Sequence, residues 1–579
     1  MVRVNGVTLI ERMLHQIEAK HLSRIVIVVG YQGKALMDYI QTLNIQTPVI
    51  FIQNPVYDTT NNIYSLALAK DWLCREDTLL FESDLIFEDS VLDLLLSDPR
   101  DTLALVDKYE SWMDGTCVKL GSDDSIERFV PGKKIRFEEI QDYYKTVNIY
   151  KFSRHFSESH YVPFLEAYQT ALGENEYYEQ VLRVITMLDD PVIKAKRLEG
   201  QQWYEIDDIQ DLDIAESIFT PDPDERVRLL QGRYGGYWRY PKLLDFCYLV
   251  NPYFPTARMK AELMANFNTL LTEYPSGMRV NSLLAAKNFN VRPDQILVGN
   301  GAAELIKSLM GFLDGKTGFI RPTFDEYPNR CDRESIVSFV PENHDYAYTA
   351  DDIMTFFSDK AVRNLVVVNP DNPSGNYIPK RDLLRLIEWA GEKKIRLLID
   401  ESFVDFADEE GSVIGQELLD RNPQLFVMKS ISKSYGVPGL RLGILASGNR
   451  ELIAKMKKDV AIWNINSFAE FYMQIEEKYR KDYEFALARI RAERGRFQIE
   501  LSKIKGMRVI PSQANFVMVE LERDISPKEL LKTLLIKYDL LIKELTTKTN
   551  GRNYLRLAVR NTEDNNVLLT ALMRELGKQ

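Results

Sequence analysis

The chain has 579 residues, 45% of them hydrophobic and 27% charged, which is too long for one ordinary core and predicts two or three globular domains. A net charge of −12 argues against nucleic acid as a partner, and four scattered cysteines without a CxxC pair predict neither a zinc site nor a disulfide framework. There is no run of 18 apolar residues, and charged residues near the start interrupt any signal peptide, so we expect a cytoplasmic protein without a membrane segment.

Helices and strands alternate in the first 218 residues, which predicts an α/β domain. Residues 8–19 have the apolar spacing of an amphipathic helix, and 25–29 read as a buried strand. Two later strands end in acidic residues, at Asp84 and at Asp207. Carboxylates that meet at one crevice could hold Mg²⁺, although Asp is also common where a strand passes into a loop. Both interpretations stay open from the pattern alone.

Five short segments of this domain match a known family. They are 4–12, 28–31, 61–66, 82–85 and 205–207. These segments resemble the sugar-phosphate and phosphocholine nucleotidyltransferases, and the resemblance covers most of residues 1–215. It implies that Asp84 and Asp207 are the metal ligands, that Asn62 lies near the nucleotide, and that CTP is a possible substrate.

The Gly-rich phosphate loop of that family would precede Val4-Asn5-Gly6, and it is absent from the sequence. Its backbone N–H groups and cations would hold the triphosphate and stabilise the developing charge. Two interpretations therefore stay open. Either the sequence lacks its true start, or the domain is inactive and serves as a nucleotide-binding or structural module.

Residues 219–229 contain two prolines among charged residues, a composition typical of a domain boundary. We expect this segment to be a linker. It would separate a domain at 1–218 from a second α/β domain at 230–579, whose small subdomain begins at about residue 465.

Three short apolar runs in the second domain read as buried parallel strands, and each leads to a polar residue. The runs 365–368, 395–399 and 425–428 are followed by Asn372, Asp400 and Lys433, respectively. Open parallel sheets bind ligands beyond the carboxyl ends of their strands. An amide, a carboxylate and an amine should therefore meet in one crevice.

A fourth strand, at 296–298, runs through a glycine turn into an amphipathic helix. The free N–H groups at such a helix start form an anion site, although a plain strand-to-helix turn has the same pattern. One cofactor would use all of these groups. Pyridoxal phosphate (PLP) needs an amine for a Schiff base, a carboxylate for its pyridine nitrogen, a donor for its phenolic oxygen and a cradle for its phosphate.

These requirements assign a role to each candidate residue. Lys433 is the amine, Asp400 the carboxylate and Asn372 the donor to the phenolic oxygen, so Lys433 and Asp400 are the catalytic pair. The phosphate would rest on the remaining groups, the N–H groups of Ala302 and Ala303, the hydroxyls of Ser430 and Ser432, and the guanidinium of Arg441.

The segments 369–375 and 430–443 resemble the fold-type I PLP-dependent aminotransferases, in the branch of histidinol-phosphate aminotransferase and threonine-phosphate decarboxylase. The resemblance covers roughly residues 230–579 and implies a large, mainly parallel sheet, a small C-terminal α/β domain and a homodimer. It also implies four further roles: Tyr274 reaches the phosphate of the neighbouring subunit's cofactor, Phe324 stacks on the pyridine ring, Arg556 binds the substrate α-carboxylate, and Asn515 lines the substrate side.

One position departs from the commonest pattern of that family. Many relatives carry Tyr three residues after the aspartate, where this chain has Phe403. Without that hydroxyl, Asn372 would hold the phenolic oxygen alone. Phe at this place is compatible with the threonine-phosphate decarboxylase branch, so transamination and decarboxylation both stay open.

The combination of the two domains is similar to bifunctional enzymes that interconvert phosphonoacetaldehyde and 2-aminoethylphosphonate and activate the latter with CTP. We therefore expect a biosynthetic aminotransferase that uses a small amino donor and a keto acid or aldehyde acceptor, with 2-aminoethylphosphonate favoured. Arg560, near Arg556, would bind the phosphonate or make a surface salt bridge. The alternative activity is decarboxylation of a phosphorylated amino acid, which needs no acceptor.

Overall fold

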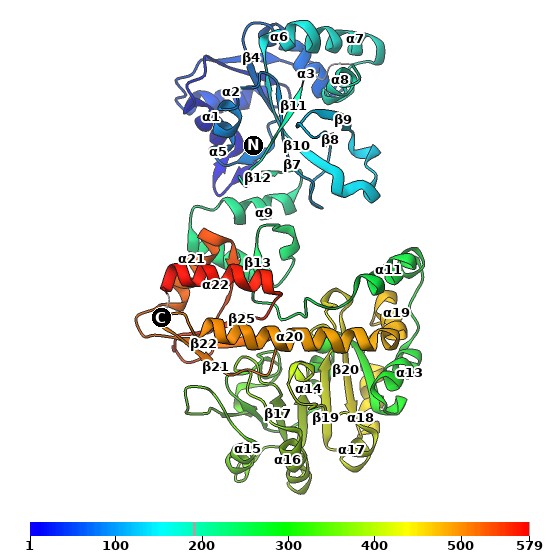
Figure 1. Cartoon of the computed structure of the whole chain (residues 1–579). Coiled ribbons are helices and arrows are strands. Elements are labelled where there is room, and N and C mark those ends of the chain that lie inside the picture. The colour runs from blue at the N-terminus through cyan, green and yellow to red at the C-terminus, as the bar shows by residue number, and fades with distance from the viewer. Residues whose placement is uncertain (189–192, 578–579) are drawn as a thin grey trace. The chain divides into compact units, whose positions relative to one another are not determined.

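The computed structural model describes residues 1–188 and 193–577. The chain divides into two compact units, Met1–Pro241 and Lys242–Gln579, which we call the N-terminal and C-terminal units (Figure 1). Each unit contains its own clusters of buried apolar side chains. Within the described residues, no helix combines the length and the apolar character that crossing a membrane requires.

The segment predicted as a linker, 219–229, lies mostly in a helix of the N-terminal unit, α10 (Pro223–Gly232). Asp222 caps this helix by accepting a hydrogen bond from the Asp224 backbone N–H, and Pro223 stands at its first turn. A proline and a capping carboxylate are as typical of a helix start as of a boundary, which is why this composition predicted a linker. The two units divide later, after Pro241.

The N-terminal unit is an α/β domain around a mixed sheet. Its strand order is β11–β7–β10–β8–β9, and β5 also pairs with β10. These strands are β5 (Thr78–Phe81), β7 (Leu103–Lys108), β8 (Cys117–Leu120), β9 (Ile126–Val130), β10 (Tyr143–Phe152) and β11 (Lys194–Arg197). The long strand β10 runs antiparallel to β5, β7 and β8, whereas β11 is parallel to β7.

A separate two-stranded parallel sheet pairs β3 (Ile25–Val29) with β4 (Val49–Gln53). The helix predicted at 8–19 is α1 (Leu9–Glu18), which begins where the Thr8 side chain accepts a hydrogen bond from the Glu11 N–H. Two short strand pairs complete the unit, β1 (Arg3–Val4) with β2 (Val7–Thr8) and β6 (Leu85–Phe87) with β12 (Trp203–Glu205).

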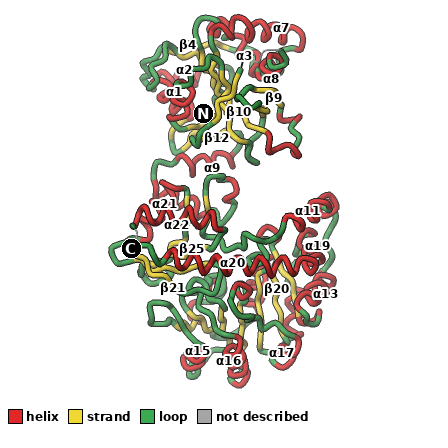
Figure 2. Tube along the Cα trace, viewed as in Figure 1, coloured by secondary structure: helices red, strands yellow, loops and turns green. Residues whose placement is uncertain are grey.

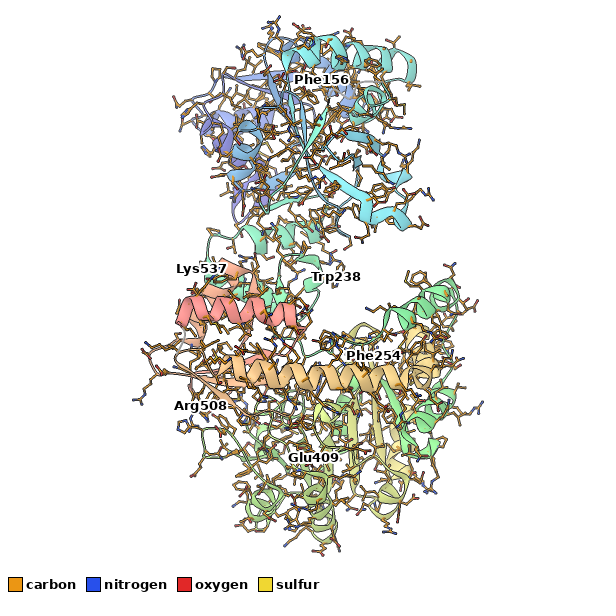
Figure 3. The ribbon with its side chains drawn as sticks, in the orientation of Figure 1. Phe156, Trp238, Phe254, Glu409, Arg508 and Lys537 are labelled. Carbon is orange, nitrogen blue, oxygen red and sulfur yellow. The ribbon has the colours of Figure 1, made fainter. Side chains whose placement is uncertain are left out.

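The other helices of the N-terminal unit cover these sheets. They are α2 (Gly33–Thr42), α3 (Asn62–Leu68), α4 (Lys70–Leu73), α5 (Ser90–Leu96), α6 (Arg154–Phe156), α7 (Val162–Leu172), α8 (Glu179–Ile185) and α9 (Ile209–Phe219). Phe156 of α6 is buried in the core that β10 forms with α7 and α8 (Figure 3).

The C-terminal unit is built on a seven-stranded sheet. Its order is β14 (Ile296–Asn300), β20 (Leu442–Ser447), β19 (Leu425–Ser430), β18 (Arg396–Asp400), β17 (Asn364–Val368), β15 (Thr317–Ile320) and β16 (Ile336–Phe339). Only β20 runs against its neighbours, so the sheet is mainly parallel, as predicted. The three strands predicted from apolar runs are β17, β18 and β19.

Both faces of this sheet are covered. Along β17, Leu365 and Val367 belong to one buried cluster, whereas Val366 and Val368 belong to another. Successive side chains of a strand point to opposite faces, so two cores sandwich the sheet. This double burial explains why the strands read as continuous apolar runs rather than as alternating ones.

Helices flank the sheets of the C-terminal unit (Figure 2). They are α11 (Ala257–Ala265), α12 (Phe267–Thr272), α13 (Met278–Phe289), α14 (Gly301–Phe312), α15 (Ala350–Phe357), α16 (Lys380–Glu392), α17 (Gln416–Arg421), α18 (Arg450–Asp459), α19 (Ser467–Ile475), α20 (Arg480–Leu501), α21 (Pro527–Tyr538) and α22 (Thr562–Leu576). The long helix α20 leads into a small sheet near the C-terminus.

That small sheet has four antiparallel strands. Their order is β21 (Met507–Ile510), β22 (Phe516–Leu521), β25 (Tyr554–Ala558) and β24 (Lys543–Glu544). A separate pair joins β13 (Leu244–Asp245) to β23 (Leu540–Leu541), so the start of the C-terminal unit is fixed to this sheet's region.

Candidate active site

Asp400 is the last residue of β18, and its carboxylate is buried. The hydroxyl of Tyr327 donates a hydrogen bond to one carboxylate oxygen at 2.7 Å, and the backbone N–H of Ser402 donates to the other at 2.9 Å. Burial raises the pKa of Asp400, and these two donors and the charge of Lys433 act against that rise. The carboxylate is therefore held in a fixed orientation at the end of β18.

Lys433 follows β19, and its charge acts on the pKa of Asp400. Burial and then the charges of Arg556 and Arg441 lower the pKa of Lys433, Asp400 acts in the opposite direction, and the resulting pKa is about 8. A lowered pKa increases the neutral fraction of an amine near neutral pH, and the neutral amine is the nucleophile. The charges of Lys433 and Asp400 act on each other's pKa, so the two groups lie near each other, and their place in one crevice stays a prediction.

Arg556, on β25, joins the small sheet to the segment after β17. Its Nη1 donates to the Asn372 side-chain oxygen at 2.7 Å, and its Nη2 donates to the Cys247 carbonyl at 2.7 Å. Its Nε is buried and has no hydrogen-bond partner among the described residues. A buried guanidinium N–H without a partner is a natural donor to a ligand oxygen.

The start of α14 and Arg441, which the sequence predicts as the anion cradle, lie against each other. Gly301 has a φ of +75°, and a Cβ placed there would lie 2.5 Å from Arg441 Nη2, so the glycine permits the guanidinium to rest on the helix start. Ala302 and Ala303 follow in the first turn of that helix. Ser432 is buried with its hydroxyl unpartnered within the described residues, whereas the buried Ser430 donates its backbone N–H to the Ser402 hydroxyl.

Two other predicted residues lie beside this centre. Asn515 is 1% exposed, and neither polar atom of its side chain has a hydrogen-bond partner among the described residues. The Phe324 ring is 40% exposed and meets the Tyr327 ring edge-on, with centroids 6.3 Å apart. Tyr327 also donates to Asp400, so Phe324 and Asp400 share this neighbour, and stacking of Phe324 on the cofactor stays a prediction.

Tyr274 and Arg560 are placed differently. Tyr274 is 77% exposed and stacks on Trp463 with ring centroids 4.5 Å apart. The Arg560 guanidinium pairs with Asp564 at 2.8 Å and donates to the Asp245 carbonyl at 2.9 Å. Its charge is therefore already compensated by the protein, which corresponds to the salt-bridge alternative for this residue.

Sequence reasoning missed two residues of the site, Tyr327 and Lys543. The hydroxyl of Tyr327 reaches a carboxylate 73 residues away, and no local pattern indicates such a contact. Lys543 is the direct partner of Arg556 in the β24–β25 pairing. Two cations in facing positions become visible only when the register of the two strands is known.

Acidic residues gather at one place in the N-terminal unit. Oxygens of Glu82, Asp84 and Glu205 lie within 4.8 Å of one another. The predicted ligand Asp84 thus has two carboxylate neighbours, whereas the predicted ligand Asp207 is outside this trio. Burial raises the pKa of Asp207, and the charge of Asp84 raises it further. Asn62 donates to Glu82 at 3.3 Å, so it lies at the same cluster.

A buried lysine, also missed, supplies positive charge to this cluster. The Nζ of Lys145 lies 3.1 Å from a Glu205 oxygen, and its side chain is 1% exposed. The Asn148 amide donates to Glu82 at 2.9 Å and to Glu205 at 2.8 Å. Burial, followed by neighbouring carboxylates, raises the pKa of Glu82 to about 8, and Lys145 acts against that rise.

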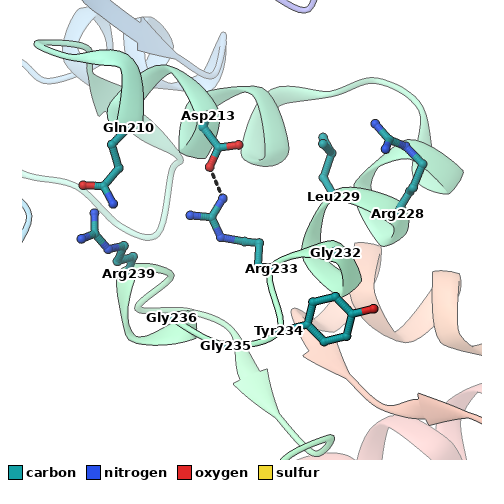
Figure 4. A pocket seen from close by; sticks show the side chains of 10 residues that line it. All are labelled: Gln210, Asp213, Arg228, Leu229, Gly232, Arg233, Tyr234, Gly235, Gly236 and Arg239. Atoms are coloured by element: carbon teal, nitrogen blue, oxygen red, sulfur yellow. Dashed lines mark hydrogen bonds and ion pairs between the residues drawn. The ribbon is translucent and has the colours of Figure 1, made fainter. Parts of the chain in front are cut away.

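A pocket of about 660 Å³ lies elsewhere in the N-terminal unit, beside α9 and α10 (Figure 4). Three arginines line it, Arg228, Arg233 and Arg239. Arg233 forms an ion pair with Asp213, as Figure 4 shows, and Arg228 pairs with Glu225 at 2.5 Å. Two of the three cations are thus compensated, and we assign no ligand to this pocket.

The sequence model of a family described as aminotransferase class I and II matches residues 252–572. The chain belongs to the aminotransferase class I and II family. As expected from the sequence motifs, this family membership makes it a PLP-dependent enzyme.

Two curated relatives show how much of this aminotransferase-family chain is similar to known proteins. It is 31% identical to the CMP-5'-(3-aminopropyl)phosphonate synthase of Streptomyces rubellomurinus over 578 residues, which cover 99% of this chain and 91% of that protein. It is also 31% identical to the L-serine phosphate decarboxylase of Sulfurospirillum multivorans over 343 residues, which cover 57% of this chain and 87% of the relative.

Solved structures confirm the aminotransferase fold of the C-terminal part. A decarboxylase from Sulfurospirillum multivorans matches with a TM-score of 0.54 at 30% identity, over 59% of this chain and 90% of that one. The histidinol-phosphate aminotransferase from Clostridium acetobutylicum matches with a TM-score of 0.52 at 28% identity, over 57% of this chain and 99% of that one.

The residues of this aminotransferase-family site fit PLP. The buried Arg556 Nε and Ser432 hydroxyl have no partners among the described residues, and ligand oxygens would satisfy both. The Gly301 turn and Arg441 would hold a phosphate, while Asp400 ends β18 and Lys433 follows the neighbouring strand β19. The site therefore offers the amine, the carboxylate and the anion cradle that the family's cofactor requires.

Proposed function

We propose that the C-terminal unit decarboxylates a small amino acid that carries a phosphate or phosphonate group, and that the N-terminal unit is a cytidylyltransferase-like domain. In this proposal the first reaction releases an amine that still bears its phosphate or phosphonate. A phosphate or phosphonate oxygen of this amine could then accept the nucleotidyl group of CTP in the second reaction. The full-length likeness to a protein whose name contains CMP and an aminoalkylphosphonate supports this combination.

The observation that carries the substrate class is the pair of cations Lys543 and Arg556. They are direct partners in an antiparallel pairing, so their side chains project from the same face with Cβ atoms ~4.5–5.5 Å apart. Like charges in facing positions destabilise a sheet. Neither residue is in an ion pair with a described residue, and the hydrogen-bond acceptors of Arg556 are neutral. A doubly anionic substrate would compensate both charges.

Each cation then has its own anion. Arg556, whose planar fork suits a carboxylate, would bind the α-carboxylate beside Asn372, and Lys543 would bind the phosphate or phosphonate. Burial lowers the pKa of Lys548, and the charges of Arg556 and Lys543 lower it further, which indicates that all three cations lie in one region. 2-Aminoethylphosphonate has no carboxylate, so its phosphonate group alone would have to meet both cations.

When bound, PLP withdraws electrons from the substrate's α-carbon so that a bond to that carbon can break. Lys433 would return a proton to this carbon after CO₂ has left, since its amine is buried beside Asp400 and has a lowered pKa. Phe403 packs edge-on against Phe516, with centroids 5.2 Å apart, and cannot donate to a phenolic oxygen. Asn372 would provide that hydrogen bond.

Transamination is the second candidate. It is the reaction expected from the sequence motifs, with 2-aminoethylphosphonate as the favoured donor and a keto acid or aldehyde as acceptor. The family description and the likeness to histidinol-phosphate aminotransferase favour it. In that reaction Lys433 would remove a proton from the substrate carbon and deliver it elsewhere on the conjugated system.

One experiment separates the two reactions. The full chain with PLP is mixed with O-phospho-L-serine labelled in its carboxyl carbon, or with 2-aminoethylphosphonate and pyruvate. Labelled CO₂ from the first mixture supports decarboxylation, and alanine from the second supports transamination. If PLP is bound, as its absorbance reports, and neither product forms, the proposed substrate class is wrong.

For the N-terminal unit we propose Mg²⁺ at the acidic cluster and CTP as the nucleotide. Oxygens that share an octahedral Mg²⁺ are ~3.0 Å apart when adjacent and ~4.2 Å apart when opposite, and those of Glu82, Asp84 and Glu205 lie within 4.8 Å of one another. Asp207 would join them once the ion draws the carboxylates together. Pyrophosphate release from CTP in the presence of an aminoalkyl phosphate tests this proposal, and a lack of release would leave the unit a binding module.

We also propose that the C-terminal unit forms a homodimer. Large apolar side chains are exposed near Tyr274, and the set comprises Met264, Phe267, Leu271, Ile462 and Trp463. A face of this kind marks a protein interface in most soluble proteins. Analytical ultracentrifugation tests the assembly, and a monomer at micromolar concentration would contradict it.

A further inference from the structure

A third cation, besides Lys543 and Arg556, joins the two sheets of the C-terminal unit. Lys548 lies in the turn between β24 and β25 of the small sheet. Its Nζ donates a hydrogen bond to the Thr323 carbonyl at 3.2 Å and forms an ion pair with the Asp325 carboxylate. Both partners belong to the segment that follows β15 of the large sheet. One ammonium group therefore ties a turn of the small sheet to a segment of the large one.

Phe324 is the residue between these two contacts. We call residues 323–325 the ring segment. A single ammonium binds the residue before the phenyl ring and the residue after it, so it holds the backbone on both sides of the ring. The ring itself is exposed and meets Tyr327 edge-on. An exposed ring takes its place mainly from the backbone that carries it, because few packing contacts hold the side chain.

The large sheet holds the same segment from its other side. The Tyr327 hydroxyl donates to Asp400 at 2.7 Å, and the Arg321 guanidinium contacts the Asp325 carboxylate at 3.4 Å. Lys548 adds a contact from the small sheet, on which the residues proposed to bind the substrate lie. The ring segment is thus fixed to both sheets.

The turn that carries Lys548 is itself held firmly. The Lys548 backbone N–H donates to the Leu545 carbonyl at 2.8 Å. The buried hydroxyl of Thr549 lies 3.0 Å from the Leu545 carbonyl oxygen and 2.9 Å from that of Arg552. A lysine side chain is long and flexible, so it can fix a partner only where its own backbone is fixed. This turn meets that condition, and the side chain of Lys548 is half-buried.

We propose that Lys548 is a positioning residue that holds the Phe324 ring in the orientation that covers PLP and thereby determines how tightly the enzyme retains its cofactor. Lys548 would touch neither PLP nor substrate. The proposal rests on the stacking of Phe324 on PLP that the sequence predicts, and it is independent of the reaction proposed above. Since the turn of Lys548 connects Lys543 to Arg556, the groups proposed to bind the substrate and the ring share one support.

Release of PLP from the full chain tests this role. Loaded protein is dialysed, and the PLP that remains is followed by absorbance. Visible circular dichroism is measured per bound PLP, because it reports whether the surroundings hold the cofactor in one orientation. Arg508→Met is the matched control. Arg508 also reaches from the small sheet to the large-sheet side, through an ion pair with Asp345 and a hydrogen bond to the His344 carbonyl at 3.1 Å.

We expect Lys548→Met and Phe324→Leu each to release PLP about 5–10-fold faster than the wild type and to weaken the circular dichroism. The double variant should release PLP no faster than Phe324→Leu, because the lysine acts through the ring. Lys548→Arg should behave like the wild type, since a guanidinium can also donate to both oxygens. Asp325→Asn keeps the lysine and weakens only its ion pair, so it should speed release by about 2–5-fold.

Three results overturn the proposal. Effects that multiply in the double variant would mean that Lys548 acts independently of the ring. An equal loss of PLP from Arg508→Met would mean that any loosening between the two sheets has this effect. Unchanged release from Phe324→Leu would mean that the ring does not cover PLP. Thermal unfolding of the PLP-free variants shows whether each is folded, and Asp325→Asn decides the question if Lys548→Met is not. No measurement uses a substrate, so failure here is distinct from failure of the proposed reaction.

Discussion

Arg556 donates a hydrogen bond to the side-chain oxygen of Asn372 at 2.7 Å. The two residues come from different sheets of the C-terminal unit, because Arg556 is on β25 of the small sheet and Asn372 follows β17 of the large one. The contact therefore fixes the residue proposed to bind the substrate to the residue proposed to hold the cofactor's phenolic oxygen.

Replacing Arg556 should weaken substrate binding and disturb Asn372 together. For Arg556→Lys we expect kcat/KM to fall ~10–100-fold, because a hydrogen bond to a charged group contributes ~1.5–3 kcal/mol and lysine cannot make the forked contact. Arg508→Lys is the matched control, since Arg508 lies on the same sheet and pairs with the surface carboxylate Glu520 at 2.6 Å. Equal kinetics in the two variants would contradict the role of Arg556.

Lys543 is expected to recognise the phosphate or phosphonate rather than the carboxylate. Lys543→Gln should raise KM for O-phospho-L-serine ~10-fold, the effect of ~1.4 kcal/mol, and change kcat little. Steady-state kinetics with the control Lys537→Gln, which removes a surface pair with Glu575, should match the wild type. A fall in kcat at constant KM would assign Lys543 to the chemical step instead.

The hydroxyl of Tyr327 should matter through Asp400. Tyr327→Phe removes a donor to a buried carboxylate, which costs ~1–3 kcal/mol of stabilisation of the charged form. We expect weaker PLP retention, measured by equilibrium dialysis, and a pH profile of activity whose acidic limb moves to higher pH. Tyr472→Phe is the control, because its buried hydroxyl has no hydrogen-bond partner among the described residues. Identical behaviour of both variants would count against this role.

Lys433 makes the stability of the PLP-free protein depend on pH. Its pKa is about 8 in the folded protein against 10.5 ordinarily, so between these values the unfolded chain binds more protons than the folded one. The free energy of unfolding should therefore rise from pH 8 to 10.5, by at most ~1.4 kcal/mol per pH unit. Below pH 8 the full cost of burying the charge persists.

Lys433→Met removes that cost. Urea unfolding should show this variant to be more stable than the wild type at pH 7, and the difference should shrink towards zero at pH 10.5. The exposed Lys481→Met serves as the control for general charge effects. A stability difference that does not change with pH would contradict the assignment of the shift to Lys433.

Lys145 should stabilise the N-terminal unit by compensating the acidic cluster. Lys145→Met leaves the half-buried Glu82 and Glu205 beside each other, and removing one partner of a buried pair costs at most ~3–5 kcal/mol. Lys194→Met removes a surface pair with Asp123 and should cost ~1 kcal/mol or less. Millimolar Mg²⁺ should restore part of the lost Tm in the first variant only, if the carboxylates bind a divalent cation. An unchanged Tm for Lys145→Met would exclude the compensating role.

The strands and the strand-end residues could be predicted from the sequence because their signals are local. Continuous apolar runs gave β17, β18 and β19, and chemistry then selected Asp400 and Lys433. Contacts between distant segments could not be predicted in this way. The pairing of Lys543 with Arg556 depends on the register of two strands.

Residues 219–229 show a second limit of sequence reasoning. A proline preceded by an aspartate occurs at helix starts and at boundaries alike, and only packing decides between them. Arg560 shows a third, because its ion pair with Asp564 and its bond to the Asp245 carbonyl depend on which acceptors the fold brings near.

The reversed strand β20 has a consequence for the spacing of the cofactor site. Because β19 and β20 run in opposite directions, with Ser430 paired to Gly443, the connection between them leaves and re-enters the sheet at one edge. Lys433 and Arg441 both lie on that connection, so a single stretch of backbone sets the separation between the amine proposed to react and the guanidinium proposed to bind phosphate. Inserting or deleting one residue in this connection would change the distance between Lys433 and Arg441. Every strand of the sheet would keep its register.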